Sequence, residues 1–134
     1  MNKKIRNATI VKFVSKTGKV IPMKSKLEKM CAEELERRGI KFQYEPFHIE
    51  IVPSFRHKDF NGRFTMAIKY TPDFIIYDNI IIELKGWSND SYPLRRKLLL
   101  KYLVDNNYPY DFYEIHTKNQ LINLLNKLQD EQQC

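Results

Sequence analysis

The chain has 134 residues, a length that allows one hydrophobic core, and we expect a single domain over residues 1–134. Its 23 Lys and Arg residues against 16 Asp and Glu residues give a net charge of +7, which favours a polyanionic partner. Two cysteines, Cys31 and Cys134, provide neither a disulfide framework nor zinc-binding spacing, and no apolar run is long enough for a signal peptide or a membrane span.

The first elements that the sequence predicts are a hairpin and a helix. The pair Thr17-Gly18 forms a turn between two apolar runs, which predicts a β-hairpin within an N-terminal extension over residues 1–24. Ser25 and Glu28 have the spacing of a capping box and begin a helix. The apolar positions of this helix recur every four residues and form one stripe: Leu27, Cys31 and Leu35.

The remaining elements alternate between strands and helices. They are, in chain order, strands over residues 41–44 and 47–52, a polar and basic loop over 53–62, a hairpin over 74–82, a helix over 92–104, a strand over 111–116, a helix over 119–128 and a frayed tail over 129–134. Helices before and after a sheet centred on a hairpin are typical of an α/β or α+β fold, in which helices flank a central mixed sheet.

The hairpin carries the most informative pattern. Two β-branched runs flank Asp78-Asn79, a turn-forming pair. Asp73 opens the first strand, and Glu83 and Lys85 close the second. Because a hairpin brings the start of its first strand beside the end of its second, these three side chains should converge at one end of the sheet.

Charged groups among isoleucines need partners, because removing an unpaired charge from water costs several kcal/mol. Two carboxylates suit Mg²⁺, which takes one or two protein carboxylates and keeps most of its waters. The alternative is a structural ion pair of Lys85 with Glu83 or Asp73 at the strand end. The spacing alone leaves both interpretations open.

Four blocks of sequence, in the same order, resemble the PD-(D/E)XK nuclease superfamily and, within it, branched-DNA resolvases of the phage T-seven endonuclease I type. The blocks are Ser25-Lys-Leu-Glu28, Gly39-Ile-Lys-Phe-Gln-Tyr-Glu45, Tyr70-Thr-Pro-Asp73-Phe and Glu83-Leu-Lys85-Gly86. The resemblance implies a restriction-endonuclease-like core with these catalytic residues: Glu28, Asp73, Glu83 and Lys85. It also implies that Mg²⁺, for which Mn²⁺ can substitute, is held by Asp73, Glu83, the Leu84 backbone carbonyl and Glu28.

The implied function is Mg²⁺-dependent DNA endonuclease activity, in the form of a phage-type resolvase that cuts Holliday junctions during DNA recombination. DNA would be the partner, cutting two strands would require a homodimer, and a phage- or mobile-element-encoded enzyme would act in the cytoplasm of a bacterial host cell. The longer loop over 53–69 departs from the resolvase pattern, so a sequence-specific or nicking endonuclease is an alternative. The alternative of another class is a catalytically idle DNA-binding protein, which would have no use for the clustered charges.

Glu28 has two interpretations. As a capping-box residue it stabilises its helix by about 1 kcal/mol. It also flanks the apolar stripe and so lies near the sheet, where the resembled nucleases have a catalytic glutamate. Glu34 is a rival, but Arg38 is spaced to pair with it on the helix surface. Glu45 is a further candidate, for which the Tyr-Glu-Pro context favours a structural role at a strand end.

The basic residues predict two DNA-binding surfaces. The helix over 92–104 should bury Leu94, Leu98 and Tyr102 and direct its cations either toward phosphates or simply toward solvent. The loop over 53–62 is the second surface. The DNA-binding candidates are Arg56, Lys58, Arg63, Trp87, Arg95, Arg96, Lys97 and Lys101. We expect no catalytic role for the three histidines, which share no metal-ligand spacing: His48, His57 and His116.

Overall fold

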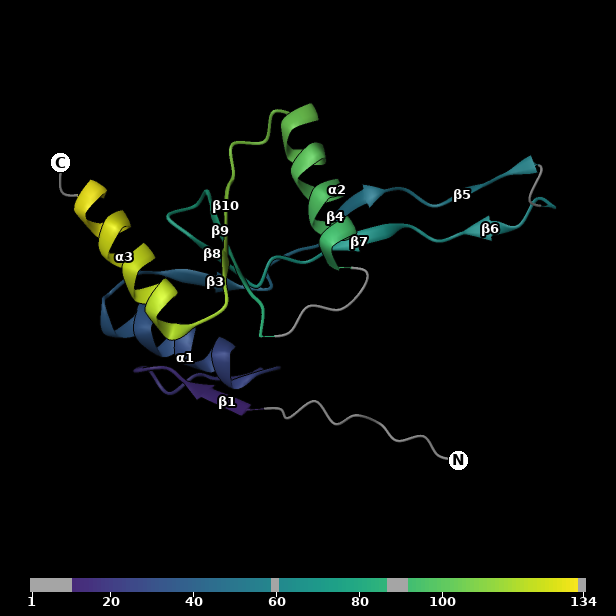
Figure 1. Cartoon of the computed structure of the whole chain (residues 1–134). Helices are drawn as coiled ribbons and strands as arrows, with labels where there is room; N and C mark the ends of the chain where they lie inside the picture. Colours follow the sequence, from purple (N-terminus) through teal and green to yellow (C-terminus); the bar gives the residue numbers. More distant parts are fainter. Residues whose placement is uncertain (1–10, 59–60, 87–91, 133–134) are drawn as a thin grey trace.

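The computed structural model describes residues 11–58, 61–86 and 92–132, so Trp87 and Cys134 lie outside the described residues. A mixed four-stranded sheet forms the centre of the fold (Figure 1). Its strand order is β10 (Asp111–Ile115), β9 (Ile80–Leu84), β8 (Phe74–Ile76) and β3 (Phe42–Tyr44). β9 pairs antiparallel with β8 and parallel with β10, while β3 pairs antiparallel with β8. The predicted α+β fold with a mixed sheet is confirmed.

The predicted β8–β9 hairpin is also confirmed, with its turn one residue earlier than expected. Ile76 pairs with Ile80, and Tyr77 and Asp78 have φ angles of 50° and 67°. Two consecutive residues in the left-handed region are typical of turns whose twist matches that of the flanking strands. The sequence favoured the later pair, Asp78-Asn79, because Asn and Asp tolerate this region better than Tyr does.

One face of the sheet is covered by two helices and the N-terminal hairpin (Figure 1). These elements are α1 (Lys26–Arg37), α3 (Lys118–Gln132), β1 (Val11–Val14) and β2 (Val20–Met23). β1 and β2 pair as predicted, and Phe13 and Met23 are 1% and 0% exposed, so the hairpin contributes to the core on this face. α3 continues through residues 129–132, where a frayed tail was expected, because the buried Leu125 and Leu128 anchor its last turns.

α2 (Tyr92–Asp105) covers the opposite face together with β4 (Ile49–Val52) and β7 (Ile68–Tyr70), which form a separate antiparallel pair. Leu99 and Leu103 are the buried leucines of α2, whereas Leu94 is 62% exposed. The buried stripe predicted for this helix is therefore wrong at Leu94, while Leu98 and Tyr102 are partly buried. Apolar residues occur on several sides of α2, so their period did not single out the face that packs on the sheet.

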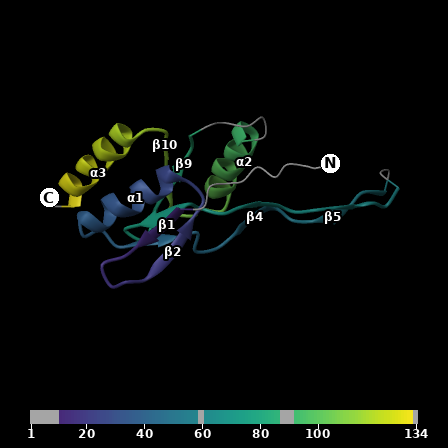
Figure 2. The same ribbon diagram turned by 90° about the horizontal axis from the view of Figure 1, so that it is seen from below.

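A two-stranded arm extends from β4 and β7 away from the rest of the protein (Figure 1 and Figure 2). β5 (Phe55–Arg56) and β6 (Phe64–Thr65) form its outer antiparallel pair. We define the arm as the described residues between 53 and 67. The expected loop over 53–62 is thus partly wrong, because it contains the two-residue strand β5. None of the helices in the described part of the chain has the length and apolar content needed to cross a membrane.

Candidate active site

The ends of β8 and β9 bring Asp73 and Glu83 together. Asp73 lies directly before β8, and its Oδ2 accepts a hydrogen bond of 2.8 Å from the backbone N–H of Leu84. Glu83 is 7% exposed, and its Oε1 accepts a hydrogen bond of 2.6 Å from the hydroxyl of Tyr70. Lys85 lines the same hollow as Glu83. The predicted convergence is borne out for Asp73 with Glu83 and for Glu83 with Lys85, whereas Asp73 does not line the hollow that contains Lys85.

Burial makes both carboxyl groups resist ionisation. Burial and the nearby Glu83 carboxylate raise the pKa of Asp73 to about 8, although the Leu84 N–H acts in the opposite direction. Burial also raises the pKa of Glu83, against the opposing effects of the Tyr70 hydrogen bond and the Lys85 charge. A divalent cation beside the two carboxyl groups would favour their ionised forms.

Glu28 caps its helix and also points toward the strand end. The Oγ of Ser25 accepts a hydrogen bond of 3.1 Å from the Glu28 N–H, as the capping box predicts. Glu28 Oε1 accepts hydrogen bonds from the Lys24 N–H at 2.9 Å and from the Tyr44 hydroxyl at 2.7 Å. The capping interpretation is confirmed, with Lys24 in place of Ser25 as the backbone donor to the glutamate.

An acidic cluster forms where α1, the end of β3 and the start of β8 meet. One carboxylate oxygen from each of Glu28, Glu45 and Asp73 lies within 4.8 Å of the others. Glu45 has a φ angle of 45°, its N–H donates to the Asp73 carbonyl at 2.9 Å, and its carboxylate pairs with Lys24 at 3.0 Å. Glu45 therefore has the structural role expected at the strand end and also adds a carboxylate to the cluster.

Glu34 has different partners. Arg38 Nε lies 2.6 Å from Glu34 Oε2, and Arg37 also bonds to this carboxylate. The hydrogen bond from Arg38 lowers the pKa of Glu34, against the opposing effect of burial. Arg38 also donates hydrogen bonds of 2.9 Å to Asn126 and Gln129 of α3. Glu34 therefore belongs to the contact between α1 and α3, and the ion pair predicted with Arg38 is confirmed.

Lys85 lies at a hollow on the α2 side of the strand end. Its Nζ is 4.3 Å from the centroid of the Tyr92 ring. The hollow has a volume of about 230 Å³ and is lined by Lys69, Tyr70, Thr71, Glu83, Lys85, Tyr92 and Arg95. Cationic side chains beside a carboxylate suit a phosphate group that binds together with a divalent cation. The carboxylate oxygens of Asp73, Glu28 and Glu45 fit Mg²⁺, which prefers carboxylate and water ligands. Among the described residues, Glu83 is not part of this close group, although it acts electrostatically on Asp73.

Comparison with known proteins identifies the family. Residues 10–111 match the family model described as Phage endonuclease I. The chain belongs to the phage endonuclease I family. Endonuclease I of Escherichia phage T7 is 36% identical over 84 residues, which cover 61% of this chain and 47% of that relative. Endodeoxyribonuclease 1 of Enterobacteria phage T3 is 38% identical over 79 residues, which cover 58% of this chain and 43% of that relative.

The chain spans less than half the length of these two curated relatives. No solved structure matches it significantly. The match to the phage endonuclease I family confirms the resemblance that the four sequence blocks carry, and the family match includes the acidic cluster, Glu83 and Lys85.

The DNA-binding candidates on α2 have different partners within the protein. Arg95 lines the hollow beside Lys85. Arg96 Nη1 instead lies 2.7 Å from Glu114 Oε1, and Lys101 Nζ lies 2.9 Å from Asp105 Oδ1. Two of the four predicted DNA-binding cations on this helix are therefore engaged in ion pairs within the protein.

The arm carries the other described basic candidates. Arg56 lies 5.6 Å from the centroid of the Phe64 ring and donates a hydrogen bond of 2.8 Å to the Gly62 carbonyl. Lys58 and Arg63 are exposed near this turn. The arm extends away from the central sheet in both views, so its outer strands β5 and β6 lie apart from the strand end that carries the carboxylates (Figure 1 and Figure 2).

Sequence reasoning missed several side chains that hold the candidate site together. Three tyrosine hydroxyls donate to glutamates at or beside the site: Tyr44 to Glu28, Tyr70 to Glu83 and Tyr92 to Glu114. Two of these tyrosines lie next to motif residues, in Tyr-Glu-Pro and Tyr-Thr-Pro-Asp, and that position was the available signal. Tyr92 and Glu114 had none, because the parallel pairing of β9 with β10 brings Glu114 opposite Glu83.

Proposed function

We propose that this protein is a Mg²⁺-dependent DNA endonuclease of the PD-(D/E)XK type that hydrolyses phosphodiester bonds. The observation that carries the proposal is the convergence of Asp73 and Glu83 at one strand end, with pKa values raised by burial and with Lys85 beside Glu83. A protein that only binds DNA gains nothing from burying two carboxyl groups, since desolvating them is unfavourable. Membership of the phage endonuclease I family supports the same reaction.

Asp73, Glu83 and the Leu84 carbonyl oxygen are the proposed Mg²⁺ ligands, and Glu28 is the proposed ligand of a second ion or of a metal-bound water. The bound cation would supply positive charge to a phosphate oxygen and lower the pKa of a water. Mn²⁺, which also prefers oxygen ligands, should substitute. The hydroxyl of Tyr70 and the Leu84 N–H each fix one carboxylate oxygen and thereby orient the two acidic ligands.

Lys85 is the proposed residue that orients the attacking water and stabilises its hydroxide form. Its ammonium borders the hollow that Glu83 and Arg95 also line. With a phosphate in this hollow, the ammonium would also offset the negative charge that builds up on the phosphate oxygens. In-line attack by water forms one P–O bond and breaks the bond to the 3′ oxygen, which leaves a 5′-phosphate and a 3′-hydroxyl.

DNA is proposed to cross the α2 side of the strand end and continue along the arm. Phosphate contacts position a duplex without reading its sequence. The proposed contacts are Arg95, Arg96, Lys97 and Lys101 on α2, Arg56, Lys58 and Arg63 in the arm, and Trp87 by stacking. Arg96 and Lys101 would have to exchange a carboxylate partner for a phosphate, so we expect less from them than from Arg95 and Lys97.

Branched DNA is the proposed substrate and a homodimer the proposed assembly. The support is the resemblance of the four motif blocks to branched-DNA resolvases, which cut two strands and therefore need two active sites. A phage-encoded enzyme of this kind would meet its DNA in the cytoplasm of the bacterial host. Sedimentation equilibrium should give twice the chain mass of 16.1 kDa, and a monomer with full junction-cutting activity would contradict the proposed assembly.

A cleavage assay with linear, nicked and four-way-junction DNA tests the proposed function. We expect the junction to be cut with Mg²⁺ or Mn²⁺ and not in EDTA. Glu33→Gln is a matched control, because this glutamate is exposed on α1 and outside the acidic cluster. Equal cutting of linear and branched DNA would retain the nuclease and overturn the resolvase. Binding of DNA without cutting under any metal condition would overturn the nuclease in favour of an idle DNA-binding protein.

A further inference from the structure

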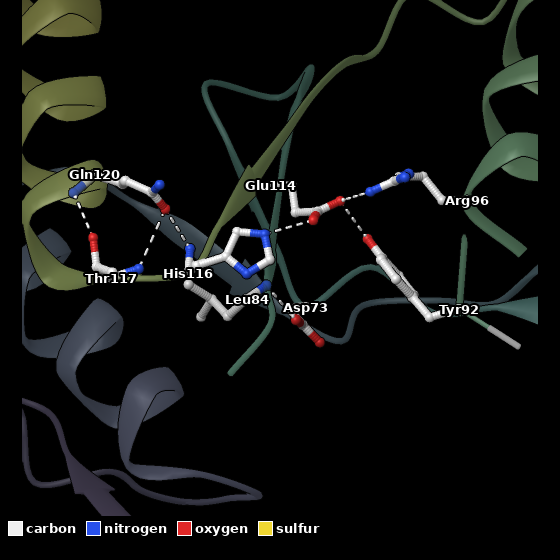
Figure 3. A network of polar contacts seen from close by, with 8 residues as sticks. All are labelled: Asp73, Leu84, Tyr92, Arg96, Glu114, His116, Thr117 and Gln120. Atoms are coloured by element: carbon white, nitrogen blue, oxygen red, sulfur yellow. Dashed lines mark hydrogen bonds and ion pairs between the residues drawn. The ribbon is translucent and has the colours of Figure 1, made fainter. Parts of the chain in front are cut away.

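Glu114 on β10 is the centre of a polar network beside the candidate site (Figure 3). It lies opposite Glu83 in the parallel pairing of β10 with β9. Its Oε1 accepts hydrogen bonds from the Tyr92 hydroxyl at 3.0 Å and from Arg96 Nη1 at 2.7 Å. Its Oε2 lies 2.6 Å from His116 Nε2. One carboxylate thus joins β10 to two residues of α2.

Tyr92 connects the first turn of α2 to this network. The buried residues of α2 are Tyr92, Leu99 and Leu103, and the two leucines lie in the second half of the helix. Leu94 is 62% exposed and Arg95 is exposed, so neither anchors the beginning of the helix. Among residues 92–97, Tyr92 is the buried one, and its hydroxyl donates a hydrogen bond to Glu114.

The ring of Tyr92 in turn contacts the ammonium group of Lys85. Lys85 Nζ lies 4.3 Å from the ring centroid, a distance at which an aromatic face attracts a cation. Both side chains line the hollow proposed for the scissile phosphate. A lysine side chain has many rotamers, and an aromatic surface that holds its ammonium reduces the number that must be excluded before reaction.

We propose that Glu114 and Tyr92 are positioning residues for Lys85: the Glu114 carboxylate fixes the Tyr92 hydroxyl, and the Tyr92 ring holds the Lys85 ammonium at the hollow. The inference rests on the proposed nuclease function, in which Lys85 acts on the attacking water. Arg96 also contributes to the network through Glu114, which gives this arginine a role besides contacting DNA.

Single-turnover cleavage by a set of Tyr92 variants tests the proposal. Tyr92→Leu removes the ring and should slow cleavage roughly 2- to 30-fold, equivalent to about 0.5–2 kcal/mol, with DNA affinity unchanged. Tyr92→Phe keeps the ring and loses its anchor, so the loss should be smaller, and Tyr92→Trp should restore most of the rate. Glu114→Ala should resemble Tyr92→Phe. Tyr108→Leu, which removes a half-exposed tyrosine outside the hollow, should keep the wild-type rate.

A double-mutant cycle separates positioning of Lys85 from general support of the fold. In a Lys85→Ala background, Tyr92→Leu should cause no further loss of rate, because its effect acts through the missing ammonium. An additive loss in that background would overturn the proposal, as would a wild-type rate for Tyr92→Leu. If Lys85→Ala itself cleaves like the wild type, the proposed function fails instead, since the role assigned to Lys85 would be absent.

Nuclear magnetic resonance supplies a readout that does not depend on cleavage. The ε-methylene protons of Lys85 should be shifted upfield in the folded protein, because the ammonium nitrogen to which this methylene is bonded lies over the Tyr92 ring. Tyr92→Leu should return them to the position of an exposed lysine, while Tyr92→Trp should retain an upfield shift. An unshifted resonance in the wild-type protein would overturn the contact on which the proposal depends.

Discussion

The strand end with Asp73 and Glu83 and the arm with Arg56 differ in how their side chains are held. At the strand end, each carboxylate accepts a hydrogen bond from another segment, and Glu83 is 7% exposed. In the arm, β5 and β6 share two residue pairs, and Phe64 is 56% exposed. Fixed geometry suits bond cleavage, whereas an exposed basic ribbon suits contacts with the phosphates of a long polyanion, which do not require fixed geometry. Changes at the strand end should therefore stop the reaction, and changes in the arm should reduce DNA affinity stepwise.

The largest effect is expected from the carboxylates. Asp73→Ala or Glu83→Ala should abolish cleavage while DNA binding persists, because Mg²⁺ has few protein ligands and the loss of one removes much of its attachment. Cleavage and fluorescence-anisotropy binding should be measured on the same preparations, with Glu33→Ala as the control. Cleavage at the wild-type rate by either variant, or in EDTA, would remove the distinction between the strand end and the arm.

The next largest effect is expected from Lys85. Lys85→Ala should slow cleavage on the order of a hundredfold or more, as is typical of a positioned group that acts on a proton or a developing charge. Lys85→Arg should not restore the full rate, because a planar guanidinium cannot replace a compact ammonium at the same point. Single-turnover rates with saturating protein measure this step directly. A rate close to that of the wild type for Lys85→Ala would reduce this lysine to a structural partner of Glu83.

The buried carboxyl group of Asp73 should also make the stability of the protein depend on pH. The folded-state pKa of Asp73 is about 8, above its unfolded value of about 4, so the metal-free folded state binds more protons and loses stability as pH rises between these values. Asp73→Asn remains neutral and should have a Tm at least several degrees above wild type at pH 8, with little difference near pH 4, since 1 kcal/mol is worth roughly 4 °C at this size. Thermal unfolding in EDTA at pH 4 and at pH 8 measures the Tm of both proteins.

Two controls belong to the same experiment. Asp105→Asn makes the same chemical change at an exposed position on α2 and should show no such pH-dependent gain. Addition of Mg²⁺ should raise the Tm of the wild type and leave Asp73→Asn almost unchanged, because binding to the folded state stabilises it by mass action. A Tm for Asp73→Asn below wild type at every pH would mean that the buried carboxyl group is favourable as it stands.

The parts of the site that the sequence predicted are those set by local geometry. Asp73, Glu83 and Lys85 converge because they flank one hairpin, and Ser25 begins α1 because its hydroxyl accepts the Glu28 N–H. These relations involve neighbours within a single element or turn. A pattern of residue types is sufficient to find them, since strand alternation and helix capping each have a fixed spacing.

The parts that the sequence did not predict depend on contacts between distant segments. Glu114 reaches the site because β10 pairs in parallel with β9, a register that no local spacing encodes. Leu99 faces the sheet because of how α2 docks, and the several leucines of this helix fit more than one stripe. The arm was expected to begin with a loop, because two isolated pairs between β5 and β6 leave too short an alternating pattern to detect.

The smallest effects are expected in the arm. Each substitution of Arg56, Lys58 or Arg63 by Ala should lower the slope of log affinity against log salt concentration by roughly 0.9 for duplex DNA, the value for one lost phosphate contact. On α2, Lys97→Ala should lower the slope by the same amount. Lys101→Ala should lower it less, because Lys101 already pairs with Asp105. Lys118→Ala on α3, which covers the opposite face of the sheet, is the matched control (Figure 1).

The length of the arm predicts how far from the cut its basic residues contact the DNA. An extended strand rises about 3.3 Å per residue, so Phe64 lies roughly 20 Å along the ribbon from Tyr70, which bonds to Glu83. That distance corresponds to on the order of six base pairs of duplex. Hydroxyl-radical footprinting should therefore show that Arg56→Ala loses protection about six base pairs from the cut and keeps protection at the cut itself. Protection lost at both places, or at neither, would mean that the arm does not lie along the DNA and that its basic residues serve another contact.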